Sequence, residues 1–343
     1  MITTTKRIAT LTLSPAIDRT LYFKNKFTAN QLNRAVSTTA IPGGKGMNVS
    51  KVISLLSKNA ESSANSNAVI SYCLLGGEEG DTISRWFEET AMESRCVKTA
   101  APSRVNIKLI DSAGTCTEAN EAGGPVTEWE LSQLLNMMST DAARGDFDLL
   151  VLGGSIPQGV DKSVYKSIIT SMKTLGVECV LDCDGDALKS ALSIKTHCPS
   201  LIKPNLFELS LLLGREFYLT ADPESNLVSL VEIADATVDI FVEKSTAVIC
   251  TLGEFGSLYT GEEGTFYTTA PKNIDVRGFA GAGDTFLAAY LWAKHSKKLK
   301  IEETLAKASS AAAAKIECEG ASLPDTAAEL FKFYDNIKVI KLR

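Results

Sequence analysis

Six continuous apolar runs with the character of β-strands recur along the chain, and stretches with helical periodicity separate them. The apolar runs are Ile8–Leu13, Ala68–Leu75, Phe147–Leu152, Val177–Leu181, Leu201–Lys203 and Ala247–Thr251. A strand that is apolar at successive positions must be covered on both faces, as in a parallel sheet between two helical layers. The helical stretches are Asn48–Leu56, Asp81–Glu93, Glu128–Met138, Lys162–Leu175, Asn205–Leu213, Asp284–Ala293 and Ile301–Ile316. This alternation predicts an α/β fold with a doubly wound, mostly parallel sheet.

Two polar regions interrupt the alternation. Arg19–Ile41 and Arg104–Glu121 contain stretches in which polar and apolar residues alternate, a pattern that favours exposed antiparallel strands. We interpret them as a small β lid over one end of a single domain that spans residues 1–343, although two surface hairpins without a role would show the same pattern. Lys58–Asn67, which is rich in Ser, Asn and Ala, is typical of a surface loop.

Composition excludes several classes of function. The 343 residues carry a net charge of -6 and no dense Lys/Arg cluster, which argues against a nucleic-acid or membrane partner. The eight cysteines form no C-x-x-C pair and the N-terminus has no long apolar segment, so we expect a cytoplasmic protein with reduced thiols. Only two histidines are present, and neither has metal-ligand spacing. Carboxylates, lysines and backbone amides must therefore carry any catalysis.

The tetrapeptide Gly281-Ala282-Gly283-Asp284 stands where a polar loop meets an apolar helical run. The first N–H groups of a helix are unpaired and attract anions, and glycines let an anion approach them closely. Asp284 could accept a proton from a hydroxyl that attacks phosphorus at this helix mouth. The alternative is that Asp284 only caps the helix, as Asp often does.

Two loops near the N-terminus suit a ligand with hydroxyl groups. Gly43-Gly44-Lys45-Gly46 precedes a predicted helix, but it is no Walker motif because glycine follows the lysine instead of Ser or Thr. It predicts a turn that exposes its backbone, with Asn48 available to bind hydroxyls. Asp18 follows the first predicted strand, where open α/β sheets bind ligands. An Asp in an ordinary turn after proline would explain Asp18 equally well.

Two further loops follow buried strands. Asn205 and Glu208 share one helix face, and their oxygens suit magnesium bound through its waters, but the same pair also matches a capping box. The loop Thr251-Leu252-Gly253-Glu254-Phe255-Gly256 could pass beneath a nucleotide. A plain hairpin turn is the alternative for that loop.

The order of these five motifs along the chain resembles that of the ribokinase-like PfkB sugar kinases. The resemblance runs from Ile8 to about Ala321 and implies a ribokinase-like αβα sandwich with a β lid. Within that family the chain looks most similar to the branch of 1-phosphofructokinases and tagatose-6-phosphate kinases. The segments that carry the closer similarity are Thr10–Asp18, Arg104–Leu109, Gly153–Gly159 and Leu201–Asn205.

Arg104, Asn106 and Lys108 alternate along one predicted strand, so their side chains share a face. Two cations and an amide aimed at one spot would hold a phosphate that is already on the sugar. The alternative is a solvated edge strand whose charges oppose aggregation. The Arg-x-Asn-x-Lys run is closest to the enzymes that act on fructose 1-phosphate.

The resemblance implies a kinase that uses ATP and Mg²⁺ to convert fructose 1-phosphate to fructose 1,6-bisphosphate. It makes Asp284 the base and Gly281, Ala282 and Gly283 the anion hole. It implies sugar and phosphate contacts at Asp18, Gly43, Gly44, Lys45, Asn48, Arg104, Asn106 and Lys108. It implies nucleotide contacts at Lys203, Asn205, Thr251, Leu252, Gly253, Glu254, Phe255, Gly256 and Gly283, with magnesium held through water by Glu208 and Asn205.

Several alternatives stay open at this level. The sugar could instead be tagatose 6-phosphate or fructose 6-phosphate, and a non-catalytic sugar-phosphate sensor is the alternative of another class. Ser14, where the branch usually has Asn, and Phe279, which could narrow the site, depart from the pattern of the branch. The exposed lid strands could also pair two chains into a homodimer.

Overall fold

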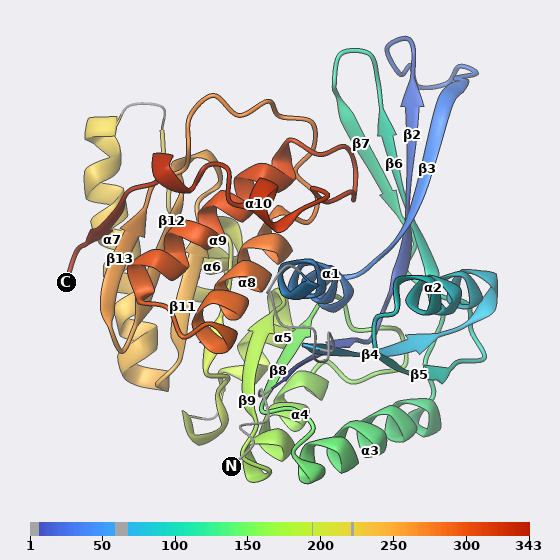
Figure 1. The fold of residues 1–343 in the computed structure, drawn as a ribbon, viewed down its shortest axis with the longest axis horizontal. Coiled ribbons are helices and arrows are strands. Elements are labelled where there is room, and N and C mark those ends of the chain that lie inside the picture. Colours follow the sequence, from blue (N-terminus) through green and yellow to red (C-terminus); the bar gives the residue numbers. More distant parts are fainter. Residues whose placement is uncertain (1–6, 59–67, 194, 221–222) are drawn as a thin grey trace.

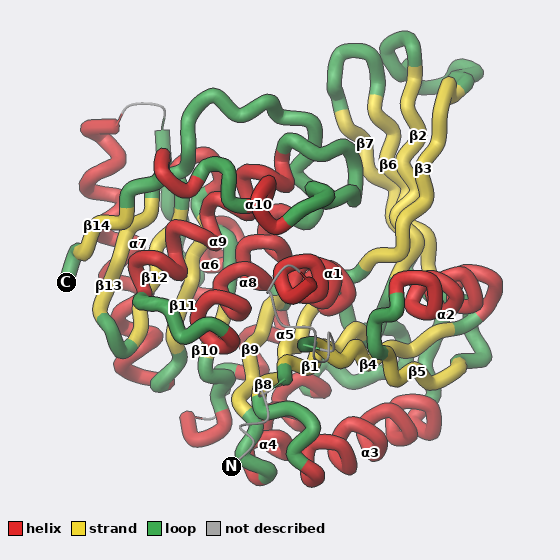
Figure 2. The backbone as a smooth tube through the Cα atoms, viewed as in Figure 1, coloured by secondary structure: helices red, strands yellow, loops and turns green. Residues whose placement is uncertain are grey.

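The chain forms a ten-stranded sheet between two layers of helices, with a second, smaller sheet at one end (Figures 1 and 2). The computed structural model describes residues 7–58, 68–193, 195–220 and 223–343, so most of the predicted Lys58–Asn67 loop lies outside the described residues. The large sheet has the order β14-β13-β12-β11-β10-β9-β8-β1-β4-β5. Its strands are β1 (Ile8–Thr12), β4 (Val69–Leu75), β5 (Ser94–Lys98), β8 (Leu149–Gly153), β9 (Glu178–Asp182), β10 (Leu201–Ile202), β11 (Ala247–Thr251), β12 (Ser257–Gly261), β13 (Gly264–Thr268) and β14 (Val339–Lys341).

The prediction of a mostly parallel sheet is confirmed. Strands β5, β4, β1, β8, β9, β10 and β11 pair in parallel, and the six predicted apolar runs coincide with six of them. Strands β12, β13 and β14 extend the sheet in antiparallel fashion beyond β11 and were not predicted. The Thr, Tyr and Gly residues of β12 and β13 break up the apolar runs that identify the other strands, and β14 has only three residues.

Helices cover both faces of the large sheet, as two separate hydrophobic clusters show. Residues of α1, α8, α9 and α10 pack in one cluster, and residues of α3, α4, α5, α6 and α7 pack in the other. Helix α2 lies beside α1 at the β4–β5 edge, in a third and smaller cluster. The helices are α1 (Lys45–Lys58), α2 (Gly77–Thr90), α3 (Glu128–Arg144), α4 (Val164–Thr174), α5 (Gly185–Ala191), α6 (Leu206–Leu213), α7 (Pro223–Lys244), α8 (Ala282–Leu291), α9 (Ile301–Ile316) and α10 (Ala327–Leu330).

Strand β1 shows why the apolar runs are continuous. Ile8 faces the cluster of α1 and α8, whereas Ala9 and Leu11 face the cluster on the opposite side of the sheet. Successive side chains of a strand point to opposite faces, so each side chain of a doubly covered strand must be apolar or must form a hydrogen bond, as Thr10 does with Ser50. All five residues of β1 are buried accordingly.

Helix α7 is the one long helix among the described residues that the sequence analysis did not predict. Its valines, including Val228, Val231, Val238 and Val242, have lower helix propensity than Leu or Ala. Ile233, Ala234 and Ile240 nevertheless bury one face of the helix in the core. Tertiary packing therefore outweighs local propensity in this helix. No helix in the described part of the chain has the length and apolar character needed to cross a membrane.

The smaller sheet consists of β3 (Ala35–Gly43), β2 (Ala16–Phe23), β6 (Arg104–Ile110) and β7 (Cys116–Asn120), in that order. Figure 1 shows it projecting away from the helical layers. The two predicted polar regions thus form one sheet, but the expectation of purely antiparallel pairing is wrong. Strands β2 and β6 pair in parallel because both leave the large sheet in the same direction, and only the outer strands β3 and β7 run against them.

Candidate active site

The mouth of α8 is built around a glycine. Helix α8 starts at Ala282, and Gly281 occupies the N-cap with a φ of 79°, a left-handed conformation that glycine adopts without strain. The Ala282 N–H already donates to the Phe279 carbonyl at 3.2 Å. Within the described residues, no backbone partner is recorded for the Gly283 N–H, which remains available at the positive end of the helix.

Asp284 lies in the first turn of α8, but it does not cap the helix. No side-chain cap is present at this N-terminus, and the Asp284 Oδ2 instead accepts a hydrogen bond from Asn48 Nδ2 of α1 at 2.8 Å. The capping alternative is therefore wrong. Asp284 is only 8% exposed. Burial, reinforced by the nearby charge of Asp182, raises the pKa of its carboxyl group above the usual range.

A polar cleft of about 200 Å³ lies in front of Asp284. Its lining includes most of the residues predicted to contact the sugar and its phosphate, namely Asp18, Gly44, Lys45, Asn48, Arg104, Asn106 and Lys108. It also includes Gly281 and Asp284, which were predicted as part of the anion hole and as the base. Ser14, Ser155, Asp184, Glu118 and Asn120 contribute further polar groups. Residues of the smaller sheet, of α1 and α8, and of the loops that follow β1, β8 and β9 thus surround a single space.

Strand β6 presents Arg104, Asn106 and Lys108 to this cleft, which confirms that the three side chains share a face. Asn106 Nδ2 donates to Asp18 Oδ1 at 2.8 Å, and Lys108 Nζ lies 3.9 Å from Glu118 Oε1. Within the described chain, the buried atoms Arg104 Nε and Asn106 Oδ1 have no hydrogen-bond partner. A buried donor without a partner costs free energy, so a ligand in the cleft would satisfy Arg104.

The glycines of Gly43-Gly44-Lys45-Gly46 serve mainly internal packing. A Cβ on Gly43 would stand 2.3 Å from Asp18 Oδ2, and a Cβ on Gly46 would stand 2.6 Å from Thr12 Oγ1. These separations are too short for any side chain, so β2 and β1 require glycine at both positions. The turn holds Asp18 in place, and only Gly44 and Lys45 of the four residues line the cleft.

A buried ion cluster lies beneath the helix mouth, and its central residue was not identified from the sequence. Asp182 lies at the end of β9 and is 2% exposed. Its Oδ1 is 2.8 Å from Lys45 Nζ, and its Oδ2 is 3.1 Å from Lys203 Nζ. Lys203 Nζ also lies 3.1 Å from the position that a Cβ on Gly283 would occupy. The sequence signal for Asp182 is its place directly after an apolar strand, where α/β sheets collect functional groups.

A larger apolar cavity of about 550 Å³ lies on the other side of the mouth. Its lining includes the predicted nucleotide residues Asn205, Thr251, Gly253, Glu254, Gly256 and Gly283. Leu252 and Phe255 pack against the hydrophobic core and are not part of the lining. The Thr251–Gly256 loop also connects the antiparallel strands β11 and β12, as the hairpin alternative predicted. Phe279, which the sequence analysis considered as a residue that could narrow the site, lines this cavity and not the polar cleft.

Asn205 and Glu208 form the capping box that the sequence also allowed. Asn205 Oδ1 accepts the Glu208 N–H at 2.8 Å, and Glu208 Oε2 accepts the Asn205 N–H at 2.9 Å. Glu208 keeps a second carboxylate oxygen. The described residues contain no cluster of three or more His, Cys, Asp or Glu side chains that could hold a metal ion. The oxygens of Asn205 and Glu208 therefore fit a magnesium ion that is held mainly by phosphates and reached through water, and they do not fit an ion coordinated by protein side chains alone.

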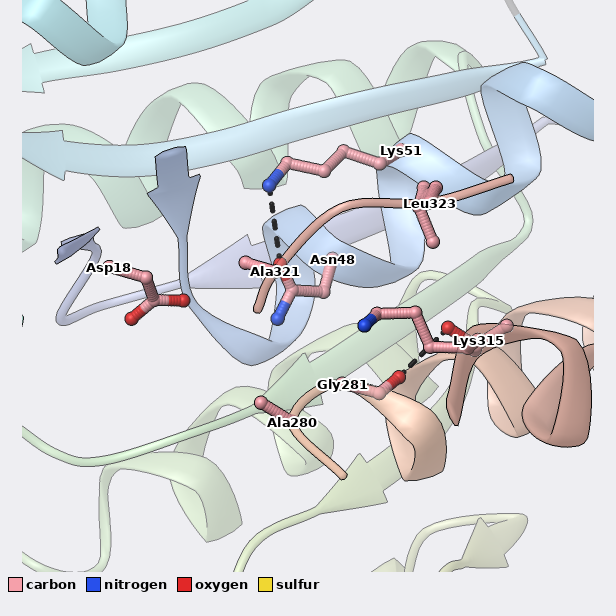
Figure 3. Close-up of a pocket in the computed structure, with 9 residues that line it drawn as sticks. Asp18, Asn48, Lys51, Ala280, Gly281, Lys315, Ala321 and Leu323 are labelled. Atoms are coloured by element: carbon pink, nitrogen blue, oxygen red, sulfur yellow. Dashed lines mark hydrogen bonds between the residues drawn. The ribbon is translucent and has the colours of Figure 1, made fainter. Parts of the chain in front are cut away.

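Two further lysines border the site and were not predicted. Figure 3 shows Lys51 next to Asn48 and the ammonium group of Lys315 between Asn48 and Gly281, and these residues line a cavity of about 20 Å³. Lys315, 2% exposed on α9, donates to the Gly320 carbonyl at 2.9 Å. In the sequence both lysines lie within helices; Lys51 is one turn after Asn48, and Lys315 is far from every motif, so only the tertiary structure brings Lys315 to the site.

The sequence matches the model of one protein family over most of its length. The sequence model described as pfkB family carbohydrate kinase matches residues 11–328. The chain therefore belongs to the pfkB family of carbohydrate kinases.

Named relatives cover nearly the whole chain. It is 28% identical over 328 residues to a 1-phosphofructokinase of Vibrio cholerae, an alignment that covers 94% of this chain and 93% of the relative. It is 29% identical over 296 residues to a 1-phosphofructokinase of Bacillus subtilis, covering 86% and 88%. The crystal structure of phosphofructokinase-2 from Escherichia coli in complex with potassium superposes with a TM-score of 0.81 at 25% identity, covering 96% and 98%. The predicted ribokinase-like fold is thereby confirmed.

Proposed function

We propose that this chain is an ATP-dependent sugar-phosphate kinase that converts fructose 1-phosphate to fructose 1,6-bisphosphate. One observation carries the proposal: the mouth of α8 borders both cavities. Gly281 and Asp284 line the polar cleft, whereas Ala282 and Gly283 line the apolar cavity. A phosphoryl donor in the apolar cavity and an acceptor in the polar cleft would therefore meet at this mouth. The similarity to two 1-phosphofructokinases supports the choice of sugar.

The polar cleft suits a sugar that already carries one phosphate. Arg104 and Lys108 supply two cations from one strand, and the unsatisfied Arg104 Nε is a donor suited to an anion. Asp18, Asn48 and Asn106 offer the paired acceptors and donors that hydroxyl groups require.

Asp284 is the proposed general base. Its carboxylate takes the proton of the sugar hydroxyl as the hydroxyl oxygen forms a bond to the γ-phosphorus, and the bond from that phosphorus to the bridging oxygen breaks to release ADP. The Gly283 N–H and the positive end of α8 stabilise charge on the phosphoryl group in transfer. Because the pKa of Asp284 is raised, the carboxylate is a stronger base than an exposed Asp.

The adenine nucleotide is proposed to occupy the apolar cavity, with Asn205 and the Thr251–Gly256 loop along its border. Magnesium fits as an ion carried by the nucleotide phosphates, with Glu208 reaching it through water. When bound, magnesium neutralises charge on those phosphates. Lys203, 6% exposed and close to Gly283, supplies a fixed positive charge at the same boundary.

The smaller sheet is proposed to act as a lid on one catalytic domain and as a contact between two chains. Its outer strands β3 and β7 are exposed along most of their length, and their outer edges offer unpaired backbone groups to a second copy. Sedimentation equilibrium tests this arrangement, and a monomer at all concentrations would contradict it.

No disulfide joins the eight cysteines, which supports the proposed cytoplasmic location.

An ADP-release assay across candidate sugars tests the proposed substrate. We expect the highest kcat/KM with fructose 1-phosphate and little turnover of unphosphorylated fructose, since only the phosphate engages Arg104 and Lys108. A higher kcat/KM with fructose 6-phosphate or tagatose 6-phosphate would change the proposed substrate but would still support a sugar-phosphate kinase. Binding of a sugar phosphate without ADP release from ATP would favour the sensor.

Replacing Lys108 with alanine is expected to raise the KM for the sugar phosphate about tenfold or more, because a buried charge-assisted contact is lost. The turnover number should change much less, since Lys108 lies away from the reacting hydroxyl in this assignment. Lys24→Ala, an exposed lysine just beyond β2, serves as the control. An unchanged KM in Lys108→Ala would remove this residue from the phosphate site.

A further inference from the structure

Lys51 lies one turn after Asn48 on α1, on the side of Asn48 away from the polar cleft. Its Nζ is 3.4 Å from Asn48 Oδ1, the contact drawn in Figure 3. Lys51 is held in place by two other elements: Nζ donates to the Pro42 carbonyl at the end of β3, and it lies 5.2 Å above the ring of Trp86 on α2. The ammonium group is therefore fixed by contacts that do not depend on the ligand.

The Asn48 amide connects Lys51 to Asp284. An asparagine side chain has an acceptor oxygen at one side and a donor NH2 group at the other, whereas an ammonium group can only donate. With Lys51 beside the amide, Oδ1 must face Nζ, and Nδ2 then faces the Asp284 carboxylate, to which it donates at 2.8 Å. The reversed amide would bring two donors together at Lys51 and two acceptors together at Asp284.

We propose that Lys51 is a positioning residue for phosphoryl transfer: it fixes the orientation of the Asn48 amide, which in turn holds the Asp284 carboxylate at the mouth of α8. The inference rests on the proposed role of Asp284 as the base. Lys51 itself touches no substrate in this assignment, because it lines the small cavity behind Asn48 and not the polar cleft.

The charged groups that face Lys51 come from three other elements. Asp18 on β2 and Asp284 on α8 attract its proton, and Lys315 on α9 repels it. Burial outweighs the two carboxylates and lowers the pKa of Lys51 to about 8. The ammonium form that orients Asn48 therefore predominates at pH 7 and is lost as the pH rises through about 8.

Loss of Lys51 should change the base and leave sugar binding largely intact. The hydrogen bond from Asn48 lowers the pKa of Asp284, so a free or reversed amide would let that pKa rise. The acidic limb of the kcat profile should then move to higher pH, because a larger share of Asp284 would be protonated at a given pH. A structural role in holding α1 against α2 would reduce stability without moving this limb.

The test compares Lys51→Met with Lys51→Arg, which keeps the cation, and with Lys58→Met, the same change at the exposed end of α1. We expect kcat on the acidic limb, below the pKa of Asp284, to fall about tenfold in Lys51→Met if that pKa rises by one unit, with the KM for sugar phosphate altered less than about threefold. Lys51→Arg should keep most of the activity, and Lys58→Met all of it. If Lys51→Met does not fold, Lys51→Gln replaces it in every comparison.

A double-mutant cycle decides whether Lys51 acts through Asn48. In an Asn48→Ala background, adding Lys51→Met should change kcat less than about twofold, because the group through which it acts is gone. The inference would be overturned if the effects of Lys51→Met and Asn48→Ala on kcat multiply in the double variant. It would also be overturned if Lys51→Met keeps the wild-type kcat and the wild-type acidic limb. If Asp284→Asn remains active, the proposed base is wrong. If Asp284→Asn is inactive while Lys51→Met behaves as wild type, only the inference about Lys51 fails.

Discussion

Replacing Asp284 with asparagine is expected to lower kcat by a factor of about 10³, the range in which general bases contribute. Asparagine keeps the size of the side chain and can still accept the hydrogen bond from Asn48, so the geometry of the mouth should survive. It cannot take a proton from the sugar hydroxyl. The affinity for ATP should barely change, because the apolar cavity is lined by other residues.

Steady-state kinetics at saturating substrates, together with calorimetric titration of ATP, measure these two quantities. Asp239→Asn, an exposed carboxylate on α7, is the matched control and should leave kcat unchanged. Near-normal turnover in Asp284→Asn would remove Asp284 from the role of base. In the wild-type enzyme, kcat should decline at low pH with a midpoint above about 3.9, the ordinary pKa of Asp, because burial raises that of Asp284.

Replacing Asp182 with asparagine is expected to reduce the free energy of unfolding by about 3 kcal/mol, because a buried charge loses its partner. Two lysines converge on Asp182, and Lys203 is almost entirely enclosed. The side chain of Lys45 is 33% exposed and can partly turn to water. Most of the loss should therefore come from Lys203, and the further change Lys203→Met should recover part of it.

Urea unfolding of the single and double variants measures this effect, with Asp186→Asn on the exposed side of α5 as the control. Burial alone would raise the pKa of Asp182, but Lys203 and Lys45 outweigh it and hold that pKa below its usual range. The stabilisation is then fully present above the unfolded pKa of about 3.9 and is lost as the pH falls through the lower folded pKa. An unchanged unfolding free energy at pH 7 would mean that the cluster contributes nothing to stability.

Sequence patterns predicted much of the fold because its parallel strands are buried on both faces. The same argument failed at the antiparallel end of the sheet and in α7. Strands β12 and β13 are largely buried but include Ser, Thr and Tyr residues, and β14 has only three residues. Helix α7 carries valines that favour strands, so none of these elements shows the pattern that marks the rest. The direction of β6 relative to β2 also could not be predicted, since a strand has the same side-chain periodicity in parallel and antiparallel pairs.

Some residues of the candidate site could likewise be predicted from local sequence patterns, and others could not. Asp18, Arg104 and Lys108 were predicted because each lies in a segment whose local pattern places a polar group at a strand end or on a shared face, and Asn48 was predicted because it follows the glycine-rich turn at the start of α1. Asp182 follows an apolar strand as Asp18 does, but no second local feature distinguished it. Lys51 and Lys315 had no local signal, because a lysine in a helix usually faces solvent.

The sequence by itself determined the positions of most parallel strands and most helices, the two-sided burial of those strands and the set of polar loops at their ends, because these depend on residues close together in the chain. The tertiary structure decided which of those groups interact. Asn48 reaches Asp284 across 236 positions, and Lys45 reaches Asp182 across 137. Whether Asp284 caps a helix or accepts a hydrogen bond from another helix depends on how α1 packs against α8, and that packing depends on apolar residues throughout the chain.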